Sequence, residues 1–133
     1  IGAQSLGIAE GALQLAVDYA KKRVQFGMPI SEQQGLQWYL AEMATRVEAT
    51  KWMVYCVAQM MKDGEKYSQN AAMVKLFSSE TARFVTERAL QIHGGYGFMK
   101  DYPIERMYRD AKITEIYEGT NEIQKTVIAR SIL

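Results

Sequence analysis

The segment SEQQGLQWYLAEMATRVEATKWMVYCVAQMMKDG, residues 31–64, decides the fold of this chain. Its apolar positions recur at alternating steps of four and three residues, the spacing of one buried stripe along a helix. These positions are Leu36, Leu40, Met43, Val47, Thr50, Val54, Val57 and Met61. Ser31 and Gln34 predict a capping box at the start of this helix, and Asp63-Gly64 predicts its end.

Four further helices are expected on either side of this segment. They run from about Ile1 to Val24, from near Ser68 to near His93, around Pro103 to Lys112, and from near Thr120 to the C-terminus. The helix from Ile1 has a narrow face of mainly small residues, formed by Ala9, Leu13, Ala16 and Ala20. The helix from Ser68 should contribute large core residues, namely Phe77, Phe84, Val85 and Ile92. Strand signals are scarce, and the connections are short, so neighbouring long helices should be antiparallel. The sequence therefore predicts an all-α, up-and-down four-helix bundle with one short additional helix.

Composition limits the classes of partner that the chain can have and excludes an internal disulfide. The chain has 133 residues, of which 48% are hydrophobic, enough for one compact core. Its 16 basic and 15 acidic residues leave a net charge of +1, which argues against nucleic acid or an anionic membrane as the main partner. No apolar run approaches the roughly 20 residues of a membrane span. The single cysteine, Cys56, excludes an internal disulfide and is expected to be a small core residue, with Met43, Met53, Met60, Met61 and Met73 as core filler.

The chain begins at Ile1 within an expected helix, and no basic region precedes its apolar residues. This beginning is unlike a signal peptide. We therefore expect the chain to be a fragment of a longer protein.

The first segment that could carry chemistry is RVQFGMPI, residues 23–30. Arg23 presents a planar fork of donors that suits a phosphate, beside an aromatic residue, a glycine and a proline. The alternative is that Arg23 only ends a helix and interacts with its dipole.

A glycine-rich segment, QIHGGYG, occupies residues 91–97. Glycines allow a backbone to approach a ligand closely and expose its N–H groups, although they also end helices. The segment is no dinucleotide fingerprint, because no strand precedes it. His93, the only histidine, is expected to be a hydrogen-bonded structural residue, and no second His or Cys stands at metal-ligand spacing.

The third segment, YEGTNE, covers residues 117–122. Glu118 precedes a glycine and a predicted helix start, where partial positive charge favours a carboxylate. A carboxylate in such a place can act as a general base, and the alternative is an acidic residue that merely caps a helix.

Together the three segments resemble the flavin-dependent acyl-CoA dehydrogenases. R-x-Q-F-G-x-P-I, Q-I-H-G-G-Y-G-F and I-Y-E-G-T-N-E-I-Q occur here in the order and approximate spacing of that family, and the resemblance covers essentially all 133 residues. It implies that residues 1–133 are the C-terminal helical domain, a four-helix bundle. The N-terminal helical domain and the middle β-domain of the full enzyme are absent from the chain.

The resemblance also implies roles for individual residues. Arg23 would contact the FAD pyrophosphate and Phe26 the adenine end, and these contacts would reach the FAD of a partner subunit. Thr120 and Glu122 would contact FAD of the same subunit, with a carboxylate at Glu122 where some members have Gln. The full set of implied FAD contacts is Arg23, Phe26, Gln34, Gln91, Gly94, Gly95, Thr120 and Glu122.

Glu118 matches the catalytic base, with Tyr117 and Gly119 beside the substrate. The implied reaction oxidises acyl-CoA to trans-2-enoyl-CoA by removal of the α-proton and transfer of a β-hydride to FAD. The implied partners are an electron-transfer flavoprotein and further copies of the chain in a dimer or tetramer. The compartment would be the cytoplasm in bacteria or the mitochondrial matrix in eukaryotes.

Two alternatives stay open. The chain could be a helical oligomerisation module without catalysis, or it could belong to a relative with another reaction, such as an acyl-CoA oxidase or a nitroalkane-oxidising flavoenzyme. The fragment is expected to be inactive alone, and acyl-chain length and branching are left undetermined.

Overall fold

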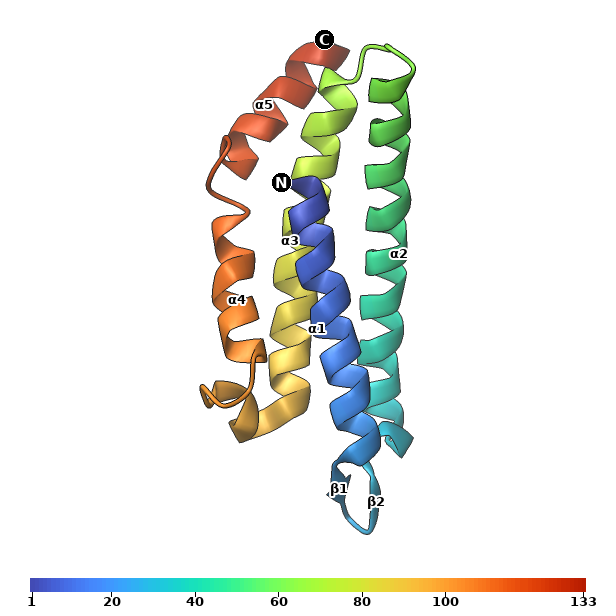
Figure 1. The fold of residues 1–133 in the computed structure, drawn as a ribbon, viewed down its shortest axis with the longest axis vertical. Coiled ribbons are helices and arrows are strands. Elements are labelled where there is room, and N and C mark those ends of the chain that lie inside the picture. Colours follow the sequence, from blue (N-terminus) through green and yellow to red (C-terminus); the bar gives the residue numbers. More distant parts are fainter.

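A computed structural model describes all 133 residues and confirms the helical bundle (Figure 1). Three long helices run antiparallel, and two shorter ones follow each other along a fourth side. The helices are α1 (Gly2–Lys22), α2 (Gln34–Lys62), α3 (Ser68–His93), α4 (Ile104–Ile113) and α5 (Asn121–Ile132). The remaining elements are β1 (Val24–Gln25), β2 (Met28–Pro29) and two 3₁₀ helices, η1 (Ile30–Glu32) and η2 (Gly94–Phe98). Helix α3 is central, because it contacts all four other helices.

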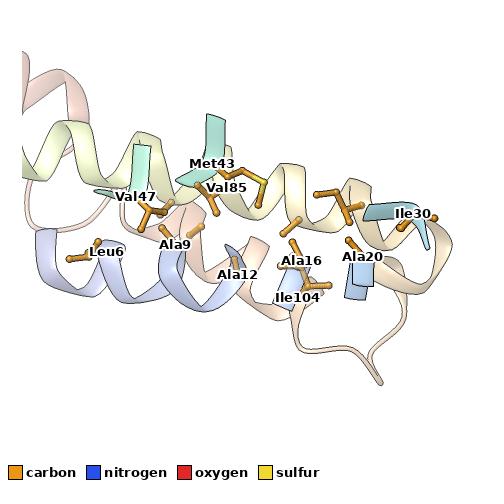
Figure 2. Close-up of a cluster of buried hydrophobic side chains, with 14 residues drawn as sticks. Leu6, Ala9, Ala12, Ala16, Ala20, Ile30, Met43, Val47, Val85 and Ile104 are labelled. Carbon is orange, nitrogen blue, oxygen red and sulfur yellow. The ribbon is translucent and has the colours of Figure 1, made fainter. Parts of the chain in front are cut away.

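Small residues let α1 approach α3 closely. Ala9, Ala12, Ala16 and Ala20 are fully buried, at the three- and four-residue spacing of one helix face. Larger side chains from the other elements fill the space around them (Figure 2). The buried members beyond these alanines are Leu6, Ile30, Met43, Val47, Ala82, Val85, Ala89, Ile92, Ile104 and Ala111. Of the large residues expected on α3, Val85 and Ile92 are buried, while Phe77 and Phe84 are only partly buried.

Three local predictions on α2 are wrong. Ser31 lies in η1, and Gln33, which makes no side-chain cap, precedes the helix, so the expected capping box does not form. Met61, in the last turn of α2, is 55% exposed. Cys56 is also exposed, since it lies about 100° around the helix from the buried Val57, on the side away from Val54.

The first helix ends two residues earlier than predicted, because Val24 and Gln25 form a short hairpin. Val24 pairs with Pro29 and Gln25 with Met28, leaving Phe26 and Gly27 as a two-residue turn. No helix of the chain has the length and apolar content required to cross a bilayer.

Candidate functional site

The hairpin end of the bundle contains a cavity of about 510 Å³. The last turn of α1, the hairpin, the start of α2 and the end of α3 with η2 form its walls. Five residues singled out in the sequence line it together: Arg23, Phe26, Gln91, Gly94 and Gly95. Gln34 is the first residue of α2 and is not part of the lining, whereas its neighbour Gln33 is.

Arg23 is the one basic side chain in this cavity besides the single histidine, and no acidic side chain lines it. Its backbone N–H donates to Tyr19 O at 2.8 Å and so caps α1. The guanidinium lies over the Tyr96 ring, with Cζ 5.2 Å from the ring centroid, and forms no salt bridge. A guanidinium without a carboxylate partner keeps its donors free for an anionic ligand.

The hairpin turn places Phe26 at the mouth of the cavity. Phe26 has φ 55° and Gly27 φ 80°, the two positive values that a type I′ turn requires. A phenylalanine rarely adopts this conformation, and here its ring is 88% exposed. The strain is thus accepted at a residue that packs against almost nothing within the domain.

The glycine-rich segment forms the opposite wall. Gly94 has φ 58° and ψ −140°, a conformation confined almost wholly to glycine, and its N–H donates to Gln91 O as α3 ends. A Cβ at Gly94 or Gly95 would meet nothing within 4 Å, so the backbone there is open to a ligand. Gly97 differs, because a Cβ there would lie 2.7 Å from Leu90 O. Two of the three glycines therefore face free space, and the third permits tight packing.

An aromatic cluster that sequence reasoning missed supports this wall. Tyr19 stacks on His93 with ring centroids 4.2 Å apart, and Tyr102 contacts both rings edge-on. His93 is buried, and its Nδ1 lies 2.7 Å from Ala89 O, which can only accept, so Nδ1 carries the hydrogen. This confirms His93 as a hydrogen-bonded structural residue. Burial lowers the pKa of His93, despite the opposing bond to Ala89, and burial raises the pKa of Tyr19.

Glu118 lies in a second cavity, of about 670 Å³ and mainly apolar, between the N-terminal turn of α1, α2, α3 and α5. Among its lining residues are Ala3, Val57 and two further polar residues, Lys75 and Gln124. The expected carboxylate therefore stands beside an apolar space large enough for part of a ligand.

The Glu118 turn has a strained backbone, and a side chain of α5 binds to it. Glu118 has φ 55° and Gly119 φ 88°, and apart from Phe26 no other non-glycine residue has a positive φ. The Gln124 amide donates to Glu118 O at 3.3 Å and to Gly119 O at 3.2 Å. The sequence analysis did not predict this role of Gln124, although the predicted start of the last helix near Thr120 places Gln124 in its first turn. The Tyr117 side chain binds to α1, because its hydroxyl donates to Gln4 Oε1.

Thr120 and Glu122 line a separate, largely charged depression of about 390 Å³. Thr120 caps α5, its hydroxyl accepting from Ile123 N at 3.4 Å. Glu122 has a lowered pKa, since its own backbone N–H and the Thr120 hydroxyl bond to the carboxylate. No group of three or more His, Cys, Asp or Glu side chains lies together as metal ligands would.

The Arg23 and Glu118 cavities share no lining residue and lie at opposite ends of α1. Ile1 and Gly2 belong to one cavity and Arg23 to the other, so the 21 residues of α1 separate them by about 30 Å. The structure therefore divides the predicted site residues into sets that one small ligand cannot join within a single chain.

Comparison with known proteins shows what the chain is similar to. Residues 1–133 match the family described as acyl-CoA dehydrogenase, C-terminal domain. The acryloyl-CoA reductase (NADH) of Anaerotignum propionicum is 59% identical over 133 residues, which is 100% of this chain and 34% of that protein. The structure of butyryl-CoA dehydrogenase from Megasphaera elsdenii superposes with a TM-score of 0.97 at 46% identity, over 98% of this chain and 34% of that one.

A chain in the structure described as the electron transferring flavoprotein of Acidaminococcus fermentans superposes with a TM-score of 0.98 at 53% identity. That match covers 99% of this chain and 35% of the other. The chain thus spans about a third of the length of the relatives it matches.

Proposed function

Because the chain belongs to the acyl-CoA dehydrogenase family, as its C-terminal domain, we propose that the whole protein oxidises an acyl-CoA thioester to the trans-2-enoyl-CoA with FAD as cofactor. Domains preceding Ile1, one helical and one of β-structure, complete the enzyme.

The conformation of Glu118 carries this proposal. A non-glycine residue in the left-handed region is costly, and such residues concentrate at active sites and ligand clamps. Here the strained residue is a carboxylate beside an apolar cavity, with Tyr117 and Gly119 as its neighbours in the chain. The Glu118 carboxylate removes the α-proton of the thioester, and Tyr117 and Gly119 adjoin the bound acyl group.

The Arg23 cavity fits the dinucleotide part of FAD. The Arg23 guanidinium lacks an acidic partner, no carboxylate lines the walls, and the backbone at Gly94 and Gly95 is open. Arg23 holds the pyrophosphate and the exposed Phe26 ring packs on the adenine end. When bound, FAD supplies the hydride acceptor for the β-carbon.

The separation of the two cavities supports a shared site. Since about 30 Å divides them, one chain contributes to two FAD sites. Arg23, Phe26, Gln34, Gln91, Gly94 and Gly95 contact the FAD of a partner subunit, and Thr120 and Glu122 contact FAD of their own. The active enzyme is then a homo-oligomer, a dimer or a tetramer.

The direction of the reaction has a second candidate. The relative that is 59% identical is named a reductase, and a carboxylate that removes an α-proton can also return it to an enoyl-CoA. Electrons would enter or leave through an electron-transfer flavoprotein, the protein named in the description of a structure that contains a similar chain. The compartment would be the cytoplasm in a bacterium or the mitochondrial matrix in a eukaryote.

Anaerobic titration of the full-length protein tests the function. A panel of acyl-CoA thioesters should bleach the flavin absorbance, and at least one chain length should do so within a single turnover. An oligomerisation module would assemble without bound flavin, and an oxidase would reduce oxygen directly after bleaching. A protein that binds no flavin, or whose flavin no acyl-CoA bleaches, would contradict the proposal.

A further inference from the structure

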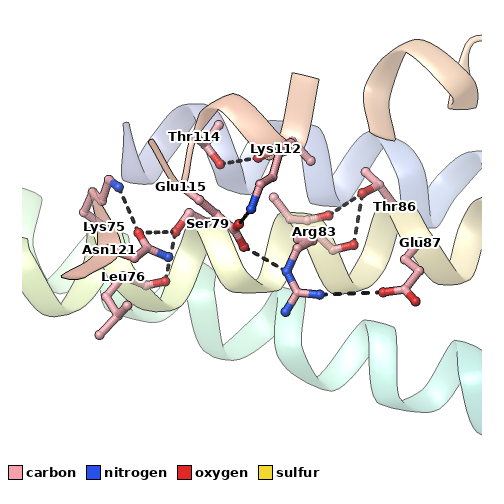
Figure 3. Close-up of polar contacts among 12 residues, drawn as sticks. Lys75, Leu76, Ser79, Arg83, Thr86, Glu87, Lys112, Thr114, Glu115 and Asn121 are labelled. Atoms are coloured by element: carbon pink, nitrogen blue, oxygen red, sulfur yellow. Dashed lines mark hydrogen bonds and ion pairs between the residues drawn. The ribbon is translucent and has the colours of Figure 1, made fainter. Parts of the chain in front are cut away.

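The loop that carries Glu118 is closed and fastened to α3 on both sides. Asn121 N donates to Glu115 O at 3.0 Å, so residues 115–121 form a closed loop with Glu118 at its middle. Glu115 and Asn121 each stand three residues from Glu118, and both bind side chains of α3 (Figure 3). The loop is thus held at two points that flank the carboxylate.

The fastening at Asn121 is the buried one. Lys75 Nζ donates to Asn121 Oδ1 at 2.8 Å, and Ser79 Oγ donates to the same oxygen at 3.0 Å. Lys75 is 7% exposed and Asn121 6% exposed, and Ser79 is fully buried. Burial lowers the pKa of Lys75, with Glu115 and Glu122 nearby opposing the shift. A buried amine that forms no salt bridge is costly unless its hydrogen bonds compensate.

The fastening at Glu115 is exposed and weaker. Arg83 Nε donates to Glu115 Oε1 at 2.8 Å and Lys112 Nζ donates to Oε2, but both cations are about half-exposed or more. Exposed ion pairs contribute little to stability. Of the two contacts with α3, the one made by Lys75 should therefore restrain the loop more strongly.

We propose that Lys75 is a positioning residue for Glu118, acting through Asn121 to hold the strained turn at the mouth of its cavity. Lys75 also lines that cavity, so its side chain forms part of the same cavity wall as Glu118. The inference rests on the proposed function, because it assigns Glu118 as the base whose position matters.

The test uses the FAD-loaded full-length protein with four variants. Lys75→Met removes the donor and keeps an unbranched side chain, and Asn121→Leu removes the acceptor. Asn121→Asp keeps an acceptor for Lys75 and Ser79, and Lys66→Met is a matched change at an exposed lysine of the α2–α3 connection. Steady-state kinetics and amide hydrogen exchange of residues 114–121 are measured for each, with residues 23–30 as the internal reference.

Lys75→Met and Asn121→Leu should lower kcat on the order of 10- to 100-fold, because a misplaced base loses its geometry. The KM for acyl-CoA and the FAD content should stay within about twofold. Exchange should rise in residues 114–121 and stay unchanged in residues 23–30. Asn121→Asp should retain most of kcat, and Lys66→Met should match the wild type.

An unchanged kcat, a rise confined to KM, or exchange that rises equally in both segments would overturn the proposal. If the wild-type protein turns over no acyl-CoA, the proposed function itself has failed. The hold of Lys75 on the loop is then decided by hydrogen exchange alone, and unchanged exchange in Lys75→Met overturns it.

Discussion

Gly94 and Gly95 are adjacent, yet alanine should affect them in opposite directions. Gly94 has φ 58° with ψ −140°, whereas Gly95, the next residue of η2, has no positive φ. A Cβ would meet nothing within 4 Å at either position, so neither alanine clashes with the rest of the domain. The difference between the two variants reports backbone strain alone.

The magnitude follows from two opposing effects. Alanine at Gly94 adds strain of about 1–3 kcal/mol, because a Cβ disfavours this conformation. Either alanine stabilises by about 0.4–1 kcal/mol through reduced freedom of the unfolded chain. Gly95→Ala should therefore be slightly more stable than the wild type, and Gly94→Ala about 2 kcal/mol less stable than Gly95→Ala.

Urea unfolding of the 133-residue chain, followed by circular dichroism, measures this difference. With a slope of about 2 kcal/mol per molar urea, the two midpoints should differ by about 1 M. Equal midpoints, or a lower midpoint for Gly95→Ala, would refute the argument that Gly94 alone bears the backbone requirement.

Three further predictions concern the core, the buried histidine and the hairpin. Met43→Ala should cost about 2–5 kcal/mol because Met43 is fully buried, and Met61→Ala at a 55% exposed site should cost under about 0.5, as judged by urea midpoints. Burial lowers the pKa of His93 in the folded chain below its ordinary 6.5, so the unfolded chain binds more protons. The free energy of unfolding that this shift contributes is fully present above pH 6.5 and should decrease as the pH falls toward the folded pKa. His93→Gln should flatten that dependence of the urea midpoint between pH 7 and 5, and an identical slope would disprove the cause. Phe26→Asn should raise stability by about 0.5 kcal/mol, because Asn tolerates φ 55°, and should weaken FAD binding by the full-length protein; unchanged FAD affinity would remove Phe26 from the site.

Helix positions were predictable where periodicity and end signals agreed, as they do for α3. The third helix begins at Ser68 and ends at His93 as expected, since the glycines after His93 stop it and Gly94 adopts a conformation suited to glycine. The hairpin was missed because a phenylalanine occupies a turn position that Asn or Asp usually takes.

The sequence predicted which residues belong to the site, but only part of how they are arranged in space. The motifs indicated Arg23, the glycines and Glu118, and the antiparallel bundle brings Arg23 and Gly94 to one end although they are about 70 residues apart. The support behind Glu118 comes from Lys75, 46 residues away from Asn121 in sequence. Contacts at that separation arise from helix packing and leave no local pattern in the sequence.

The most direct measurement of the central claim is single-turnover flavin bleaching by acyl-CoA in the full-length Glu118→Gln variant. Glutamine keeps the size and shape of the side chain but cannot accept the α-proton as a carboxylate does. We expect the bleaching rate to fall by about 10²–10⁴-fold, with flavin content unchanged and with Glu65→Gln, at an exposed loop position, at the wild-type rate. A Glu118→Gln protein that bleaches at the wild-type rate would contradict the account.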